Sequence, residues 1–332
     1  MDNASPVGFA VIGSSGHGAR VSAPTIERAG NARLVGVLGS TPERGRVLAD
    51  LHGCTGYTDW DELAADDAVE AVWIAAGPNA AKPEYVKRCL EAGKHVLLDK
   101  PMATRYEDAL EIEALAEASD RVFAVGYQHR FRDAHRWIRD SIADGIVGRP
   151  RMLRVQGFVR FPYFEDMPER PEGWRASLSE SGGWVVNDVG THLVDLSMWF
   201  LGERAQLIHS APRNFRFTEV TSEDTAALTL ETEGGSLILI QVSNAMSSFP
   251  RTIEVHGLDG WLRADDTFNN PGSVLAHTGE VRQFDDGPAE DVYVVALEDF
   301  ARGVRDEPMH GATAADGAAA VEIVEAAANW PR

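Results

Sequence analysis

The densest group of reactive side chains lies between Gly182 and Asp195. His192 follows Asp188 by four residues, and Asp195 comes three residues later. Residues at these spacings share one face of a helix. A carboxylate one turn from a histidine can orient the imidazole, which then takes or gives a proton near neutral pH. The pattern predicts a catalytic pair, Asp188 and His192, that also contacts substrate beside Asn187.

Other interpretations of these residues stay open. Asp188 is also a suitable helix N-cap, and His192 can be an interior histidine with satisfied hydrogen bonds. One histidine and two aspartates can ligate a metal, but the sequence holds no matching further cluster of ligands, so we expect no metal.

A second reactive group, Lys100, follows the apolar run His95–Leu98 within Asp99-Lys100-Pro101. Such a run predicts a parallel strand, and ligands bind at the carboxyl ends of parallel strands. An ammonium group there can share a proton with a substrate hydroxyl and stabilise charge on its oxygen. We therefore predict that Lys100 is catalytic and contacts substrate, and that Lys100 and Asp99 contact a cofactor. The alternative is an ordinary surface lysine.

The first apolar run, Gly8–Ile12, leads into a glycine-rich turn. Compared with G-x-G-x-x-G, Gly13 and Gly18 match, and Ser15 stands in the middle glycine's place. Amide groups at such a turn suit a pyrophosphate, although many glycine-rich turns bind nothing. The predicted cofactor-binding residues of this turn are Gly13, Ser14, Ser15, Gly16 and His17.

The second apolar run ends at Gly39, where an NAD site usually carries an acid for the ribose hydroxyl. Ser40, Thr41 and Arg44 follow and suit a 2′-phosphate. The sequence therefore favours NADP(H), with NAD still possible. Ser40 or Thr41 before Pro42 can equally cap a helix, and both roles can hold together.

Two further stretches have a functional and a structural interpretation. The aromatic residues Phe158, Phe161, Tyr163, Phe164 and Trp174 can stack on a sugar ring or form core, and Tyr163 is a substrate-contact candidate. The stretch 128–130, Gln-His-Arg, lies at a junction where substrate meets cofactor, or is a solvated linker.

Regular elements must position these side chains. Up to residue 128, apolar runs alternate with helical segments, which predicts a doubly wound parallel sheet of the Rossmann type. The predicted strands cover residues 8–12, 34–38, 69–75, 95–98 and 122–125.

Beyond residue 128 the runs alternate with period two, which indicates an antiparallel sheet with helices on one side. Segments 224–231 and 236–243 flank Glu233-Gly234-Gly235 and predict a hairpin. The chain thus divides into a nucleotide-binding domain, 1–128, and a second, substrate-binding domain, 129–332.

The composition limits the classes of protein to which this chain can belong. The 332 residues suit two domains, and 44% hydrophobic residues suit a globular protein. The 31 basic and 51 acidic residues give a net charge of −20, which argues against nucleic-acid binding. No apolar stretch is long enough to predict a membrane span. Two cysteines and a polar first segment lead us to expect a cytoplasmic protein.

Together, these motifs resemble the Gfo/Idh/MocA oxidoreductases, the family of glucose–fructose oxidoreductase and inositol dehydrogenase. The resemblance covers essentially the whole chain. The matching segments are Gly8–Gly18, Ala75-Ala76-Gly77-Pro78-Asn79, Ala92–Pro101, Gly182-Gly183, Asp188–Asp195 and Leu297–Phe300. It implies a Rossmann domain followed by an α/β domain whose open, mostly antiparallel sheet pairs subunits into homodimers or homotetramers.

The resemblance also implies site residues. Lys100, Asp188 and His192 match the family's lysine, acid and histidine. Further cofactor contacts implied or expected are Ala76, Pro78, Asn79, Gln128 and the pair Trp174-Arg175. The sequence departs from the family pattern at Asp99, usually Glu, at Lys82, often His, and at Trp184, frequently Gly.

The expected function is transfer of a hydride between NADP(H) and a carbinol or ketone carbon of a sugar, cyclitol or sugar-like substrate. A dinucleotide-binding regulator without turnover is one alternative. A redox-assisted glycosidase, in which transient sugar oxidation allows a leaving group to be eliminated, is another.

Overall fold

The computed structural model describes residues 5–77, 79–162, 167–248, 251–268, 271–288 and 291–331. These residues form two compact units. Unit 1 takes the described parts of residues 1–103, 107–128 and 290–318, and unit 2 those of 104–106, 129–289 and 319–332. The chain changes units after Gln128, near the expected boundary, but it returns to unit 1 over 290–318. A simple division into 1–128 and 129–332 does not include this return.

Unit 1 is built on a six-stranded parallel sheet with the strand order β3-β2-β1-β4-β5-β6. Its strands are β1 (Val7–Ile12), β2 (Ala32–Leu38), β3 (Thr55–Tyr57), β4 (Ala71–Ile74), β5 (His95–Leu98) and β6 (Phe123–Val125). This order reverses direction around β1, as in doubly wound dinucleotide-binding folds. The five predicted strands are confirmed, and β3, only three residues long, is an addition.

Helices cover this sheet because its strands are apolar on both faces. The helices of the unit are α1 (Ala23–Arg28), α2 (Pro42–His52), α3 (Trp60–Ala65), α4 (Lys82–Glu91), α5 (Tyr106–Ala118) and α9 (Asp291–Val304). Phe9 and Val11 of β1 share one apolar core with Ile26 of α1 and Phe300 of α9. The late segment α9 therefore completes the core of the first strands.

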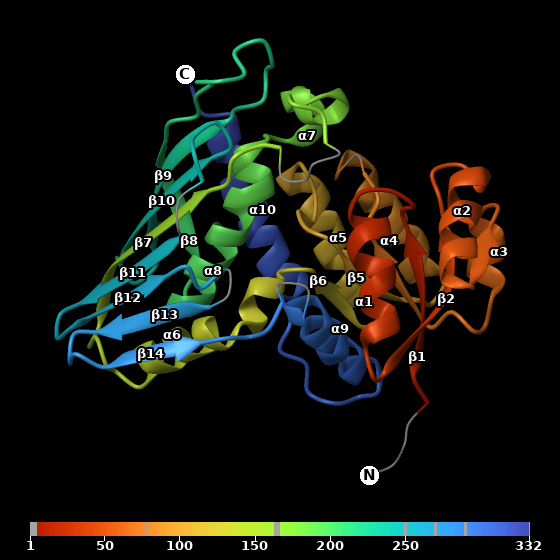
Figure 1. The fold of residues 1–332 in the computed structure, drawn as a ribbon, viewed down its shortest axis with the longest axis horizontal. Helices are drawn as coiled ribbons and strands as arrows, with labels where there is room; N and C mark the ends of the chain where they lie inside the picture. Colours follow the sequence, from red (N-terminus) through yellow and green to blue (C-terminus); the bar gives the residue numbers. More distant parts are fainter. Residues whose placement is uncertain are drawn as a thin grey trace. The chain divides into compact units, whose positions relative to one another are not determined.

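Unit 2 holds an eight-stranded sheet in the order β14-β13-β12-β11-β7-β10-β9-β8. Figure 1 lets the reader follow this order from β9 to β14. The strands are β7 (Pro150–Phe158), β8 (Ala205–Ser210), β9 (Thr225–Thr232), β10 (Leu237–Ser243), β11 (Thr252–Gly257), β12 (Trp261–Asp265), β13 (Gly272–Ala276) and β14 (Val281–Phe284). Only β7 and β10 pair in parallel. The fold class and the β9–β10 hairpin are thus confirmed.

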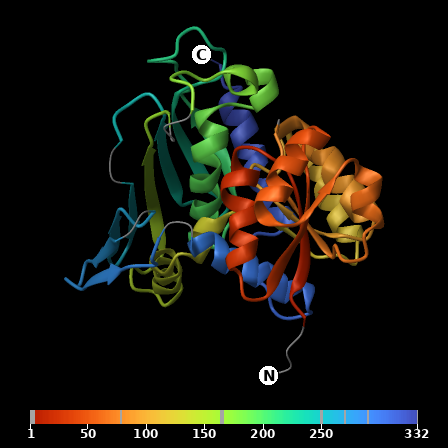
Figure 2. The same cartoon turned by 45° about the vertical axis from the view of Figure 1, so that its right-hand side comes forward.

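Helices line one face of the large sheet. They are α6 (Asp133–Ala143), α8 (Thr191–Leu201) and the second half of α10 (Ala314–Ala328), and a short helix, α7 (Leu178–Ser181), precedes α8 (Figures 1 and 2). A Cβ on Gly157 of β7 would lie 3.0 Å from Val189 and 3.1 Å from Leu193. This glycine therefore allows α8 to approach the sheet closely.

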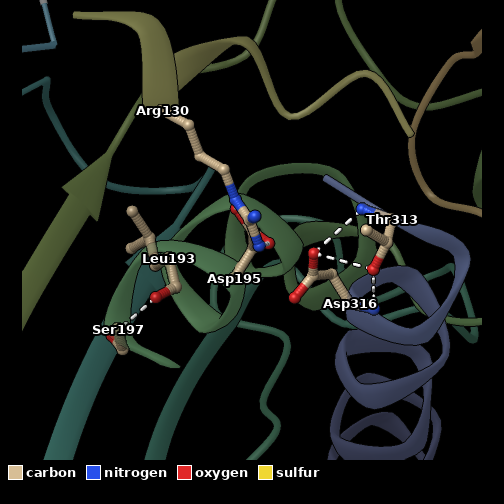
Figure 3. Close-up of polar contacts among 6 residues, drawn as sticks. All are labelled: Arg130, Leu193, Asp195, Ser197, Thr313 and Asp316. Carbon is tan, nitrogen blue, oxygen red and sulfur yellow. Dashed lines mark hydrogen bonds and ion pairs between the residues drawn. The ribbon is translucent and has the colours of Figure 1, made fainter. Parts of the chain in front are cut away.

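The helix α10 begins with reciprocal capping bonds, shown in Figure 3. The backbone amide of Thr313 donates to the Asp316 carboxylate at 2.9 Å, and the Asp316 amide donates to the Thr313 hydroxyl at 3.2 Å. Such a capping box fixes where a helix starts. Within the described residues, no helix has the length and apolar character needed to cross a membrane.

Candidate active site

The turn after β1 is closed by two glycines. Gly13 has a φ of +127°, and a Cβ there would lie 3.0 Å from the Ala75 carbonyl carbon. A Cβ on Gly18 would lie 2.2 Å from the carbonyl oxygen of Gly13. Both positions exclude a side chain, so the chain reverses tightly and enters a helical turn at Gly18 that continues into α1.

This turn fits the pyrophosphate of a dinucleotide. Gly16 has a φ of +55°, and no atom of the described residues lies within 4 Å of the place of its Cβ. In the same turn, the hydroxyl of Ser14 is buried and has no hydrogen-bond partner in the described part of the chain. The first amides of a helix also lack partners within the helix. A phosphate can accept hydrogen bonds from the Ser14 hydroxyl and from these amides.

The junction between β2 and α2 explains why no acid stands at Gly39. A Cβ there would lie 2.4 Å from the amide nitrogen of Gly45, so any side chain would collide with the backbone. Thr41 caps α2, because its hydroxyl accepts a bond from the Arg44 amide at 3.4 Å. The Arg44 guanidinium donates to the Ser40 hydroxyl at 3.4 Å. The capping role of Thr41 is therefore confirmed, and Ser40 and Arg44 lie together.

Polar and aromatic groups gather at the carboxyl ends of β1, β4 and β5. The imidazole of His17 lies 3.7 Å from the Asp99 carboxylate, and its ring centroid is 5.5 Å from that of Tyr293 and 6.4 Å from that of Trp73. The side-chain amide of Gln128 donates to the Tyr293 hydroxyl at 2.9 Å. The structure thus groups three predicted cofactor residues, His17, Asp99 and Gln128. It adds Tyr293, which sequence patterns did not indicate because it belongs to α9.

The remaining unit 1 candidates lie close to the same strand ends in sequence. Lys100 is half-buried directly after β5, and its peptide bond to Pro101 is cis. Ala76 follows β4 and is half-buried, and Asn79 is buried in a short helical turn. Two candidates, Pro78 and Tyr163, lie outside the described residues.

The segment that carries Asp188 is not the regular α-helix we expected. Residues Val186–Gly190 form a π-helical turn, and α8 starts only at Thr191. Because a π turn is wider than an α turn, the simple four-residue spacing from Asp188 to His192 is wrong as a description of one α-helical face. Both side chains are half-buried.

Buried polar groups fix the entry to this π-helical turn. The carboxylate of Glu223 accepts a bond from the Val186 amide at 2.9 Å, and its carbonyl accepts one from the Val185 amide at 3.2 Å. The side-chain amide of Asn187 donates to the Ser181 carbonyl at 2.7 Å. The predicted substrate residue Asn187 is therefore buried, and its side-chain NH2 group is hydrogen-bonded within the protein. Glu223 lies just before β9 and carried no sequence signal.

His192 lies against a second histidine. Its ring centroid is 4.8 Å from that of His129, edge to face. Burial, and beside it the electrostatic effect of the neighbouring His192, Arg132 and Arg251 side chains, holds the pKa of the His129 imidazole well below its usual range. His129 is therefore neutral near pH 7.

Asp195 forms a buried ion pair with Arg130. The Arg130 guanidinium binds its carboxylate with two hydrogen bonds, one of them 3.0 Å long, as Figure 3 shows. Their side chains are only 6% and 1% exposed. The stretch 128–130 is buried throughout, so the interpretation as a solvated linker is wrong.

Within the aromatic stretch, Phe161 belongs to the core, and Phe164 lies outside the described residues. Phe161 packs edge to face on Trp184 at 5.1 Å and on Phe217 at 6.1 Å, and all three are buried. Trp184, which replaces a frequent glycine, thus fills a small apolar cluster. The Arg175 guanidinium stacks on the Trp174 ring at 4.3 Å, and the role of this pair toward nicotinamide stays a prediction.

Within the described residues, no three or more histidine, cysteine, aspartate or glutamate side chains gather as metal ligands would.

Comparison with known proteins identifies the family. Residues 7–127 match the family described as "Oxidoreductase family, NAD-binding Rossmann fold", and residues 135–263 match the "GFO/IDH/MocA C-terminal domain". The chain is 30% identical over 316 residues to 1,5-anhydro-D-fructose reductase of Ensifer adhaerens, covering 91% of each protein. It is 27% identical over 290 residues to D-xylose 1-dehydrogenase [NADP(+)] of Haloarcula marismortui, covering 84% of this chain and 79% of that protein.

A solved structure agrees with the fold. The oxidoreductase domain protein from Kribbella flavida superposes with a TM-score of 0.86 at 24% identity, over 98% of this chain and 96% of that one. The order of the two matched segments along the chain is the same as the order of the two sheets described above. The chain therefore belongs to the Gfo/Idh/MocA oxidoreductase family.

Proposed function

We propose that the protein is an NADP(H)-dependent oxidoreductase that interconverts a carbinol and a ketone carbon of a sugar, cyclitol or sugar-like molecule. The observation that carries the proposal is the Gly13–Gly18 turn, which has open space at the Cβ position of Gly16 and a buried hydroxyl without a described partner at Ser14. The names of the two relatives, one an anhydrosugar reductase and one a pentose dehydrogenase, support the substrate class.

A bound nicotinamide supplies the two-electron, hydride-transfer chemistry. In the oxidative direction His192 takes the proton of the substrate hydroxyl, while Lys100 stabilises the negative charge that develops on that oxygen. Asp188 orients His192 or contacts a neighbouring hydroxyl. The neutral ring of His129 lies edge to face against the ring of His192.

The same proposal includes a preference for NADP(H). The backbone around Gly39 leaves no room for the acid that would bind an unphosphorylated ribose. Ser40 and Arg44 lie together beside that position and can donate hydrogen bonds to a 2′-phosphate.

Two single substitutions test the catalytic assignment. Lys100→Ala and His192→Ala should each lower kcat by about 10²–10⁴-fold, the usual contribution of a positioned proton-transfer group. NADPH binding, followed by fluorescence titration, should persist in both variants. The panel of substrates should hold aldoses, anhydrosugars and cyclitols.

Lys87→Ala provides the control, because Lys87 lies on α4 and belongs to no part of the proposed site. Wild-type kcat in both Lys100→Ala and His192→Ala would refute the assigned roles. Binding of NADPH without turnover on any substrate of the panel would favour a dinucleotide-binding regulator instead.

A further inference from the structure

A buried lysine holds the segment that carries Lys100. Lys82, the first residue of α4, is 1% exposed. Its ammonium group donates hydrogen bonds to three consecutive carbonyl oxygens, those of Asp99 at 2.6 Å, Lys100 at 2.9 Å and Pro101 at 3.0 Å. An ammonium has three protons, so these carbonyls match its full donor capacity.

Convergence of three consecutive carbonyls on one atom constrains the backbone. Along a β-strand, the pleat turns successive residues to opposite sides, so a regular continuation of β5 could not direct all three carbonyls at one nitrogen. The chain must curl around the Lys82 ammonium directly after Leu98. Since a buried charge is costly without hydrogen-bond partners, the ammonium is stable there only while the three carbonyls stay converged.

We propose that Lys82 is a positioning residue for Lys100, which sets the path of the backbone from which the Lys100 side chain projects. The inference rests on the proposed function in one respect, the catalytic role of Lys100. Lys82 itself touches backbone oxygens of the segment, and no step of the reaction is assigned to it.

A second buried lysine provides a matched control. Lys94 is 7% exposed, and its ammonium donates to the carbonyls of Asp66 at 3.0 Å and Val69 at 2.9 Å. These carbonyls precede β4, at the opposite end of the sheet from Lys100. Removing either ammonium takes a charged hydrogen-bond donor from backbone carbonyls, but only removal of the Lys82 ammonium acts on the Lys100 segment.

The test compares Lys82→Met, Lys82→Arg and Lys94→Met in the full chain. Lys82→Met should lower kcat by about 10–100-fold, the order expected when a reacting group is misplaced by about 1 Å. The Kd for NADPH and the KM should stay near wild type. Lys82→Arg keeps a charged donor, so its kcat should lie between those of wild type and Lys82→Met. Lys94→Met should keep the wild-type kcat.

A second readout needs no activity. The chain has only four lysines, Lys82, Lys87, Lys94 and Lys100. Acetylation followed by mass spectrometry therefore gives the reactivity of Lys100 relative to that of Lys87. This ratio should change in Lys82→Met and hold in Lys94→Met.

The outcomes separate the two proposals. Wild-type kcat and acetylation ratio in a folded Lys82→Met would overturn the positioning role, as would equal loss of kcat in Lys82→Met and Lys94→Met. If Lys82→Met does not fold, Lys82→Arg decides by the same criteria. If the wild-type protein turns over no substrate, the proposed function fails, and the acetylation ratio alone decides the role of Lys82.

Discussion

Burial of a single imidazole, that of His135, ties stability to pH. Its two ring nitrogens face the His129 carbonyl at 2.8 Å and the Thr267 hydroxyl at 3.1 Å. Burial lowers its pKa to about 3, from an ordinary value of about 6.5. Below pH 6.5 the unfolded chain therefore binds a proton that the folded protein does not bind.

The free energy of unfolding should consequently fall as pH decreases from about 6.5 toward 3, with a contribution from His135 of up to about 1.4 kcal/mol per pH unit. In His135→Gln this part of the slope should disappear. Urea unfolding at pH 7, 6 and 5 measures the slope. His277→Gln, at an exposed histidine, should keep the wild-type slope. If the free energy of unfolding had the same pH slope in wild type and His135→Gln, His135 would not contribute to the pH dependence.

Single residues also show how far a sequence can be interpreted. The Gly13–Gly18 turn, Asp99 and Lys100 fall at the strand ends where they were predicted, because strand-then-glycine and strand-then-lysine are local patterns. Glu223 and Tyr293 were not predicted, because each acts through contacts with residues that are distant in sequence. Long-range contacts of this kind leave no spacing to recognise.

At the scale of elements, the β2–α2 junction should decide which nucleotide binds. Arg44→Ala removes the guanidinium that lies beside the Ser40 hydroxyl, so it should weaken NADPH binding by about 10–100-fold. NADH binding should change little, because NADH lacks the 2′-phosphate. Fluorescence titration with both nucleotides measures the effect, and Arg46→Ala, an exposed arginine on the same helix, is the control. If the wild-type protein bound NADH as tightly as NADPH or more tightly, the proposed preference for NADP(H) would be wrong.

Elements differ in how visible they are in the sequence. The buried parallel strands of unit 1 were predicted within a few residues, because each has a sustained apolar run. The strands β3, β8, β12, β13 and β14 were missed, since they are short or present polar residues on an open side. The π-helical turn before α8 was also missed, because it depends on the buried Glu223.

The whole molecule should assemble through the open face of the large sheet. Met152, His256 and Trp261 are cross-strand neighbours, and Met152 and Trp261 are 38% and 37% exposed. We expect a homodimer or homotetramer that covers this face. The double substitution Met152→Glu/Trp261→Glu should give monomers in light scattering, because it places like charges in the contact.

Leu51→Glu is the control for this experiment, since Leu51 is an exposed leucine of unit 1, 76% exposed. It should keep the wild-type mass. A monomeric wild-type protein, or an unchanged mass in the double variant, would exclude this surface as the contact.

The return of the chain to unit 1 bears on how the protein is made. Leu297 and Phe300 of α9 belong to the same apolar core as Phe9 and Val11 of β1. A ribosome releases the N-terminus first, and domains generally fold as units during synthesis. The apolar core of unit 1 therefore stays incomplete until α9 has been translated. The unit that holds β1 thus completes its core with a segment from late in the chain.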